Sequence, residues 1–353
     1  MQKTEIPPFV GELARDVEAA LDALITREER RWIADSPDLA VLFDELRGLV
    51  LGGGKRMRPA FCLLGALAAG GTKNDDLVRA GAALEMLHAM ALFHDDVIDG
   101  SASRRGHETT HVRHARLHRE GGWAGDAQRF GDGVAILVGD LAYVYADQFM
   151  ESMPARVRDV WAQMRLEVNI GQYLDVSGSV RRDFTLATAE RIGLFKTAKY
   201  TIERPLHIGA LIGDPNVTSG VLDALSGYGV SLGVAFQMRD DVLGVFGEPD
   251  VTGKPAGDDL RESKPTALIA EAIAVATPAQ RSVLDGIGTA GLDATRIDDI
   301  RRVIVDTGAL ASVESQIGTL TDTAVRALDV LDLSSDVHEK FVSLADAIAW
   351  RSV

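Results

Sequence analysis

Two groups of aspartates lie in apolar segments, where carboxylates are costly to bury. Asp95, Asp96 and Asp99 end the run ALEMLHAMALFHDDVID. Asp240 and Asp241 lie in a similar setting in AFQMRDDVLGVFG. A carboxylate in such surroundings needs a cation or hydrogen bonds that replace its lost hydration. We therefore expect both groups to bind a cation.

On a helix, the first group forms a stripe of candidate metal ligands. Successive residues turn by about 100°, so Asp95 and Asp99 share a face, with Cβ atoms about 5–6 Å apart. His88 lies on nearly the same stripe. Two carboxylates this close repel unless a cation lies between them, and hard oxygen ligands suit Mg²⁺, which commonly bridges to substrate phosphates. Taken alone, the motif also fits a solvated acidic helix end.

Basic residues follow the first group. The segment GSASRRG places Arg104 and Arg105 a few residues beyond Asp99. Guanidinium groups suit bidentate phosphate contacts, although acid and base so close in sequence can also neutralise each other at a surface. Carboxylates that hold Mg²⁺, beside arginines that hold phosphate, would form a site for a metal-complexed diphosphate.

The second group, with Gln237 one turn before it, lies on another predicted helix. Apolar residues on both sides predict that this helix is largely buried, and the alternative is a polar helix face. If the two acidic helices face each other across a cavity, they can hold one metal cluster from both sides.

The segment LGGGKRMRP predicts a second anion site. It is not a P-loop, because Leu49 stands where a glycine is needed and Arg56 stands where Ser or Thr is needed. It fits a glycine turn that opens a helix, and Lys55, Arg56 and Arg58 then crowd a helix N-terminus, which favours anions. With no carboxylate nearby in sequence, it is a candidate site for a metal-free diphosphate. The alternative is a basic surface turn.

The periodicity of the chain predicts an all-α protein with a single domain over residues 1–353. Apolar residues recur at spacings of three and four, and strand patterns are scarce. Segments 118–133 and 247–266, rich in Gly and charge, predict long loops, and the second is a candidate lid. The clearest helical patterns span residues 10–25, 77–99, 133–150, 157–176, 228–246 and 312–331.

The composition predicts a soluble protein with a large core. Of the 353 residues, 46% are hydrophobic, and the formal net charge of -15 argues against nucleic acid as a partner. The single cysteine, Cys62, excludes an intrachain disulfide and fits a reducing compartment. No run of about 18 apolar residues occurs, and the first residues lack a signal-peptide pattern. We therefore expect a cytoplasmic protein without a transmembrane segment.

Taken together, the motifs make the chain resemble the trans-polyprenyl diphosphate synthases. The resemblance implies an isoprenoid synthase fold, which is a large helical bundle with a central cavity, and it implies a homodimer. It also implies condensation of isopentenyl diphosphate with an allylic diphosphate (dimethylallyl, geranyl or farnesyl), with three Mg²⁺ per active site when substrate is bound. The matching blocks, in order, are GGGKRMRP, HAMALFHDDVIDGSASRRG, GQYLD, FKTAKYT, FQMRDDVLGVFG and GKPAGDDLRESKPT.

The resemblance implies a role for each group of site residues. The metal ligands would be Asp95, Asp96, Asp99, Asp240 and Asp241. The allylic diphosphate would be held by Arg104, Lys196, Lys254 and Lys264. Isopentenyl diphosphate would be held by Lys55, Arg58, His88 and Arg105. The residues near the reacting carbons would be Lys196, Thr197 and Gln237.

One position departs from the family pattern. Family members often have a third aspartate in the second motif, where this chain has Gly244, so metal binding would rest on Asp240 alone or on Asp240 together with Asp241. Two alternatives remain: a non-catalytic regulatory subunit of a related synthase, and a class I terpene cyclase. A cyclase would not need the GGGKRMRP and RRG segments, and the intact first motif argues against the regulatory subunit.

Product length depends on the helix before Asp95. The residues four and five positions earlier, Ala91 and Met90, lie about 6–7.5 Å below the carboxylate. In short-chain family members an aromatic residue here stops growth, whereas Ala91 leaves space and Met90 is flexible. We therefore expect a product beyond farnesyl, with geranylgeranyl diphosphate as the best single prediction. Phe61 and Tyr143 are candidates for residues that stop growth of the tail farther from the metal site, at the floor of the tail pocket.

Overall fold

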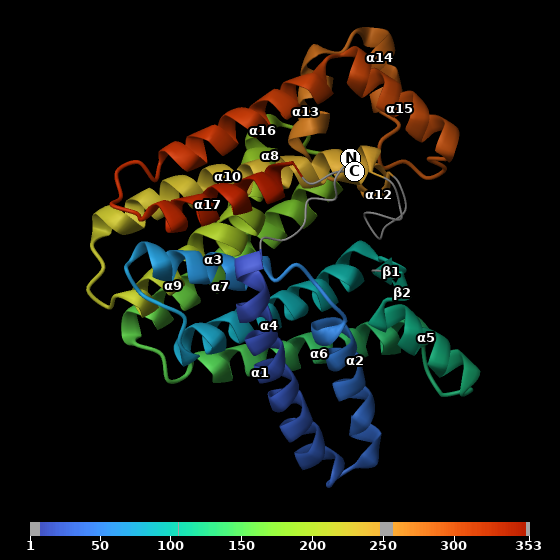
Figure 1. The fold of residues 1–353 in the computed structure, drawn as a ribbon. Helices are drawn as coiled ribbons and strands as arrows, with labels where there is room; N and C mark the ends of the chain where they lie inside the picture. The colour runs from blue at the N-terminus through green and yellow to red at the C-terminus, as the bar shows by residue number, and fades with distance from the viewer. Residues whose placement is uncertain (1–7, 105, 248–256, 351–353) are drawn as a thin grey trace. The chain divides into compact units, whose positions relative to one another are not determined.

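The computed structural model describes residues 8–104, 106–247 and 257–350, and its regular structure is almost entirely helical (Figure 1). The all-α prediction is confirmed; the described residues contain only two short strands, β1 (Ser103–Arg104) and β2 (His107–Glu108). They form two compact units. The N-terminal unit comprises residues 8–158 and 208–215, and the C-terminal unit comprises residues 159–207 and 216–350. The single domain predicted over residues 1–353 stays a prediction.

The N-terminal unit is organised around α4, which carries the first aspartate group. This helix packs against α6, α3 and α1, and α5 packs against α6. The helices of this unit are α1 (Pro8–Ile33), the 3₁₀-helix η1 (Pro37–Leu39), α2 (Ala40–Leu51), α3 (Met57–Ala68), α4 (Asp75–Asp99), α5 (Thr110–Glu120), α6 (Ala127–Met150) and the ends of α7 (Ala155–Arg181) and α9 (Arg204–Gly213).

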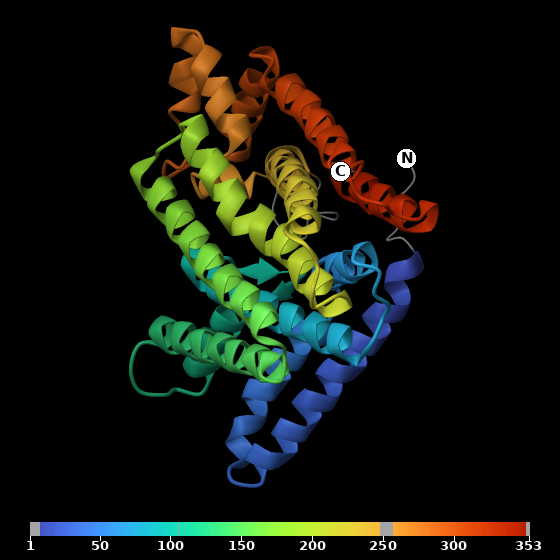
Figure 2. The ribbon, with the colours of Figure 1, turned by 90° about the vertical axis from the view of Figure 1, so that its left-hand side faces the viewer.

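The C-terminal unit is organised around α10, which carries the second aspartate group. Figure 2 shows α7, η2 and α10 (green to yellow) side by side, and apolar residues from α10 and α12–α16 form a continuous core. Besides most of α7 and the start of α9, the helices are α8 (Leu186–Ile192), the π-helix η2 (Gly193–Glu203), α10 (Ser219–Phe246), α12 (Asp258–Arg261), α13 (Ala267–Val275), α14 (Pro278–Leu284), α15 (Ala294–Asp306), α16 (Ala309–Arg326) and α17 (Ser335–Ala349).

Local signals set both ends of α4 and so place the first aspartate group. The Asn74 side chain accepts a hydrogen bond from the Leu77 N–H at 2.9 Å, which caps the first turn. Gly100 adopts φ +65°, a left-handed conformation that ends the helix directly after Asp99. Asp96 and Asp99 thus fall in the last turn, with Asp95 directly before it, where the helix dipole is negative and carboxylates are unfavourable. This placement needs a compensating positive charge.

The long loop predicted over residues 118–133 is wrong. Helix α5 runs to Glu120, and α6 begins at Ala127 with the Asp126 side chain as its cap. Gly131 lies inside α6. A Cβ atom at this position would lie 2.1 Å from the backbone oxygen of His111 on α5, so only glycine fits here. The glycine therefore allows two helices to pack closely; it does not form a turn.

Helix α10 has the composition of a membrane span but the contacts of a core helix. Among the described residues, it is the one helix that is long and apolar enough to cross a membrane, and 39% of the apolar window is buried. It carries the buried Arg239, which donates to Glu314 at 2.7 and 2.6 Å and to the Ala349 carbonyl at 2.8 Å. Such polar contacts are typical of a helix in the core of a globular protein.

Candidate active site

The structure divides the three aspartates of α4 by environment. Asp96 is buried, whereas Asp95 and Asp99 are half-buried. Arg104, on β1, donates to Asp96 Oδ1 from Nε at 2.8 Å and from Nη2 at 2.6 Å. The same Nη2 atom lies 3.9 Å from Asp95 Oδ2. The arginine predicted to act with the aspartates therefore lies directly beside them.

Asp96 and Arg104 stabilise each other's charged forms. Burial alone would lower the pKa of Arg104, but the hydrogen bonds to Asp96 and the charges of Asp96, Asp95 and Asp99 raise this pKa above its ordinary value. A guanidinium has five N–H donors in a fixed fork, so Asp96 can orient it with two of them. Asp96 is thus placed to orient Arg104, and Asp95 and Asp99 present the more accessible carboxylates.

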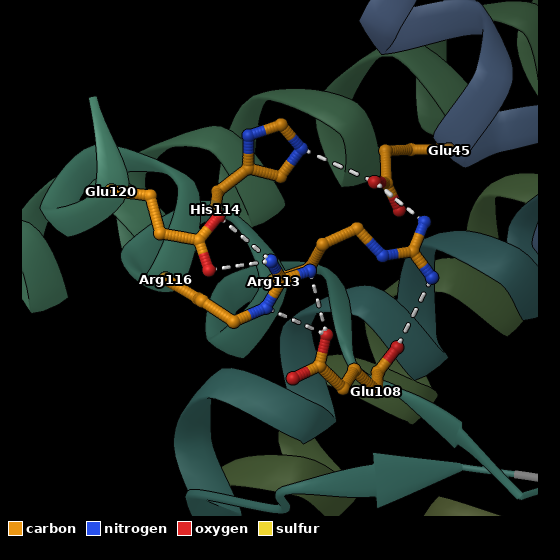
Figure 3. Close-up of polar contacts among 6 residues, drawn as sticks. All are labelled: Glu45, Glu108, Arg113, His114, Arg116 and Glu120. Atoms are coloured by element: carbon orange, nitrogen blue, oxygen red, sulfur yellow. Dashed lines mark hydrogen bonds and ion pairs between the residues drawn. The ribbon is translucent and has the colours of Figure 1, made fainter.

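The hairpin that carries Arg104 is anchored where α5 begins. Thr109 Oγ1 donates to the Ser101 carbonyl at 2.7 Å, which closes the base of the hairpin. Arg116 of α5 donates to Glu108 of β2 at 3.2 Å from Nη2 (Figure 3). These contacts tie the hairpin to α5, and Arg104 is therefore carried on a segment with a defined position.

Glu45 ties α2 to the same end of α5. This buried carboxylate accepts a hydrogen bond from Thr110 Oγ1 at 2.7 Å. It also accepts one from Arg113 Nη1 at 3.0 Å and lies 3.2 Å from His114 Nε2 (Figure 3). Burial alone would raise the pKa of Glu45, but the hydrogen bonds from His114 and Thr110 and the charge of Arg113 lower it below its ordinary value. The carboxylate is therefore ionised at neutral pH and anchors α5.

The glycine turn before α3 is anchored by a buried arginine. Arg56 is 5% exposed and adopts φ +48°. Its guanidinium donates to Glu85 at 2.6 Å, to Glu18 at 3.1 Å and to the Val50 carbonyl at 2.8 Å. Arg56 was expected beside the anion-binding residues Lys55 and Arg58, but its charge serves these internal contacts. The acidic Glu85 inside an apolar helix was the signal for such a partner.

Of the four residues predicted to hold isopentenyl diphosphate, Arg58 and His88 lie on α3 and α4, and Lys55 lies in the turn before α3. Lys55 is exposed directly before α3, and Arg58 is half-buried in its first turn. His88 is half-buried on α4, two turns before Asp95. The turn that presents Lys55 is set by Arg56. Arg105, the fourth residue of this group, lies outside the described residues.

A hydrogen-bond chain links η2 to the second aspartate group. Thr197 Oγ1 donates to Gln237 Oε1, and Gln237 Nε2 donates to Asp241 Oδ1 at 2.7 Å. Asp241 is buried, whereas Asp240 is half-buried. The structure therefore brings Thr197, Gln237 and Asp241 together, and it leaves Asp240 as the more accessible carboxylate of the pair.

Asp241 lies among other carboxylates. Its pKa is raised to about 7, first by burial and then by the charges of Asp259 and Asp175, while hydrogen bonds from Gln237 and the Ala267 backbone act in the opposite direction. Negative charge is therefore concentrated along this part of α10. A cation here would relieve the repulsion.

Lys196 and Thr197 lie on a π-helix, a rare element that is frequent at functional sites. Lys196 Nζ donates to Asp175 of α7, a buried carboxylate in the quoted GQYLD block. Two glycines let neighbouring helices approach η2. A Cβ atom on Gly171 of α7 would lie 2.3 Å from Lys196 N, and one on Gly233 of α10 would lie 2.3 Å from Ala198 Cα. The sequence analysis did not identify these glycines.

The remaining predicted residues lie partly outside the described structure. Lys254 belongs to residues 248–256 of the predicted lid, which are not described, and residues 258–261 of that predicted loop form α12 instead. Lys264 pairs with Glu262 at 3.0 Å. For product length, Met90 is buried and Ala91 half-buried on α4, while Phe61 is fully buried on α3. Tyr143, on α6, is half-buried.

The carboxylates of α4 fit a Mg²⁺ ion whose coordination shell is completed by substrate phosphate and water. Within residues 8–104, 106–247 and 257–350, no group of three or more His, Cys, Asp or Glu side chains could hold a metal ion by itself. Mg²⁺ usually binds one or two carboxylates and takes its remaining ligands from water and substrate phosphates. Asp95 and Asp99, one turn apart on α4, meet this requirement, and Arg104 beside them suits the phosphate.

Comparison with known proteins gave consistent matches. Residues 40–305 match the model of the polyprenyl synthetase family. The geranylgeranyl diphosphate synthase of Methanosarcina mazei is 32% identical over 345 residues, which is 95% of this chain and 94% of the relative. The geranylfarnesyl diphosphate synthase of Aeropyrum pernix is 32% identical over 310 residues, covering 83% and 89%.

A solved structure is also similar over nearly the whole chain. It is the geranylgeranyl pyrophosphate synthase of Corynebacterium glutamicum, complexed with isoprenyl diphosphate and magnesium. It shares 38% sequence identity with a TM-score of 0.91, covering 97% of this chain and 99% of that one. The names of these relatives specify different product lengths. The matches therefore identify the family but not the length of the product.

Proposed function

Because the chain belongs to the polyprenyl synthetase family and is therefore a prenyltransferase, we propose that it condenses isopentenyl diphosphate with an allylic diphosphate to give geranylgeranyl diphosphate. The observation that carries this proposal is the contact of Arg104 with the aspartates of α4. It places a phosphate-binding side chain beside carboxylates that suit Mg²⁺. The relative of known structure was crystallised with both magnesium and isoprenyl diphosphate.

The residues of this chain have distinct tasks in the reaction. Asp95, Asp99 and Asp240 would hold the metal, because they are the more accessible carboxylates of the two groups. Mg²⁺, when bound, neutralises the charge that develops on the departing diphosphate. As the family resemblance implies, Arg104, oriented by Asp96, and Lys196, oriented by Asp175, would each add positive charge at the allylic diphosphate.

The second substrate carries the nucleophile, so no activated side chain is required. The allylic C–O bond breaks, the double bond of isopentenyl diphosphate attacks the allylic cation, and a proton leaves to the released diphosphate. Lys55, Arg58, His88 and Arg105 would hold isopentenyl diphosphate without a metal, since the N-terminus of α3 favours anions. Thr197 and Gln237, which are hydrogen-bonded to each other, would flank the reacting carbons.

A product assay tests the proposal against its two rivals. The purified protein receives Mg²⁺, farnesyl diphosphate and labelled isopentenyl diphosphate, and dephosphorylated products are separated by chromatography. A labelled product that is five carbons longer supports the synthase. A cyclised hydrocarbon from the allylic substrate alone would instead indicate a cyclase. Turnover that appears only with an added synthase subunit would indicate a regulatory role.

We propose geranylgeranyl diphosphate as the product because the floor position before Asp95 carries no aromatic residue. Met90 is 8% exposed and Ala91 is half-buried, and in this proposal the growing tail passes both residues. One relative is named for this product, and another is named geranylfarnesyl diphosphate synthase, for a product one isoprene unit longer. In this proposal Met90 moves aside, because its unbranched side chain adapts to irregular space.

Met90→Phe is expected to shorten the main product. The added ring occupies volume on α4, one to two turns below the metal-binding carboxylates, and so blocks the tail earlier. Chromatography of the dephosphorylated products gives the chain length directly. Val78→Phe, near the start of the same helix and half-buried, serves as the control and should leave the length unchanged. An unaltered product from Met90→Phe would place the floor elsewhere.

We further propose that the protein is a soluble cytoplasmic homodimer. On α7, Leu166, Ile170, Tyr173 and Val180 are 51–81% exposed and share one helix face at spacings of four, three and seven. On α6, Leu137 and Val144 are more than half exposed at a spacing of seven. Exposed apolar surface of this extent is typical of an interface, and a two-fold symmetric dimer would bury it against its own copy.

Sedimentation velocity is expected to give a dimer at micromolar concentration. The double variant Ile170→Glu with Tyr173→Glu should sediment as a folded monomer, because two charges would lose their hydration in the interface. Val330 is 78% exposed in a turn of the C-terminal unit, so Val330→Glu should remain dimeric. A wild-type monomer, or a dimeric double variant, would contradict this interface.

A further inference from the structure

The second aspartate group lacks a side chain at its third position. Gly244 lies one helical turn after Asp240 on α10, and residues four apart share a helix face with Cβ atoms about 5–6 Å apart. A carboxylate at position 244 would therefore stand beside that of Asp240. Glycine is also unfavourable inside a helix, by about 1 kcal/mol relative to alanine. Its presence in the last turn of α10 requires a structural reason.

That reason is a carboxylate from another helix. A Cβ atom built on Gly244 would lie 1.8 Å from Asp259 Oδ2 and 2.5 Å from Asp259 Cγ. The Asp259 carboxyl group thus occupies the space where a side chain at position 244 would begin. Any residue other than glycine would displace it. Gly244 and Asp259 are complementary: the absence of one side chain allows the other to lie against α10.

The backbone holds Asp259 firmly in this place. It lies on α12, which Gly257 opens with φ +79°. The next residue, Leu260, is fully buried in the core, and its carbonyl accepts a hydrogen bond from Gly288 N at 2.9 Å. The Asp259 carbonyl accepts one from Lys264 N at 3.0 Å. The approach of Asp259 to α10 therefore follows from packing on both sides of it.

We propose that Asp259 supplies the third carboxylate of the second aspartate motif, and that Gly244 gives it access to the face of α10 that carries Asp240. The inference rests on the proposed function, since it assigns Asp259 to the metal-complexed diphosphate of that reaction. Asp259 either binds the ion or accepts a hydrogen bond from its water. In both cases Asp259 supplies from α12 the third carboxylate, which α10 lacks because residue 244 is glycine.

Four variants separate this role from a structural one. Asp259→Asn keeps the volume and removes the charge, and Asp259→Ala removes both. Gly244→Asp places a carboxylate on α10 but overlaps Asp259. Gly244→Asp combined with Asp259→Ala moves the carboxylate from α12 to α10 and removes the overlap. The matched control is Asp258→Asn, one residue away, where the carboxylate pairs with Arg261 at 3.1 Å.

Metal binding is measured without turnover. Mn²⁺ is titrated into each protein with inorganic diphosphate, and electron paramagnetic resonance reports the free ion. Asp259→Asn and Asp259→Ala should raise the half-saturating Mn²⁺ concentration by about tenfold or more, as for other groups that support a metal site. Gly244→Asp should bind weakly too. The exchanged double variant should recover most of the affinity, because the two positions are coupled through shared space.

Chemical unfolding shows whether each variant is folded, so that a change in Mn²⁺ affinity can be separated from a loss of structure. Wild-type Mn²⁺ affinity in folded Asp259→Asn overturns the inference, as does a double variant no better than Asp259→Ala. An equal loss in Asp258→Asn overturns it too, because the effect would then belong to α12 as a whole. If the wild-type protein binds Mn²⁺ with diphosphate but does not elongate an allylic substrate, the proposed function fails. If it elongates and Asp259→Asn binds Mn²⁺ normally, only this inference fails.

Discussion

Asp99→Ala and Asp95→Ala are each expected to lower turnover by at least about a hundredfold while the fold persists. The two carboxylates lie one turn apart at the end of α4 and are the accessible members of their group. A metal supplies several kcal/mol of charge stabilisation, and each 1.36 kcal/mol corresponds to about a tenfold change in rate. Losing either ligand should therefore remove most of the catalysis.

Removing and restoring the divalent metal should show that the lost activity is due to lost metal binding. Chelation of divalent ions should abolish wild-type elongation, and added Mg²⁺ should restore it. The variants should need higher Mg²⁺ for the activity that remains, with circular dichroism unchanged. Asp44→Ala, which removes an exposed carboxylate from α2 of the same unit, should behave as wild type. Normal turnover in Asp95→Ala or Asp99→Ala would refute the assignment of these residues to the metal.

Gly233→Ala is expected to lower elongation activity by about a hundredfold, because a displacement of about 1 Å at catalytic groups has effects of that size. The new Cβ atom would lie 2.3 Å from Ala198 Cα and 2.5 Å from Ala198 Cβ. Neither backbone can avoid the overlap by a rotamer change, so η2 and α10 must separate. Lys196 and Thr197 precede Ala198 directly and would move with it.

The same substitution elsewhere on α10 provides the control. Gly220 is exposed, and the nearest atom to a Cβ there, Thr218 Oγ1, is 3.8 Å away. Gly220→Ala should keep full activity and stabilise the protein slightly, since alanine favours the helix. Gly233→Ala should also lower the free energy of unfolding by about 1–3 kcal/mol, as overpacking does. Full activity in Gly233→Ala would show that η2 tolerates displacement.

The local sequence was sufficient to predict the helix that carries the first aspartate group. The α4 helix predicted over residues 77–99 is observed as Asp75–Asp99, because apolar spacing and a glycine stop signal act within a few residues. For the same reason Asp95 and Asp99 could be assigned to one face from their spacing. Basic residues after the motif predicted the neighbour that the structure identifies as Arg104.

Glycines were misread where their role depends on a distant segment. Gly131 indicated a loop, but it lies in α6 against the backbone of α5. Gly171 and Gly233 gave no signal, although both accommodate η2. A glycine that forms a turn and one that allows close packing are identical in sequence, because the difference lies in what fills the space beside it.

Charge partners were likewise decided by tertiary structure. Arg56 is as basic as Lys55, but folding buries it between Glu85 and Glu18, whereas Lys55 stays exposed. Gly244 could be recognised from sequence as a missing carboxylate. Only the packing of α12 against α10 shows that Asp259 occupies the space beside it. Helix phase is local and can be calculated from spacing, but the pairing of charges follows from long-range packing, which no short segment encodes by itself.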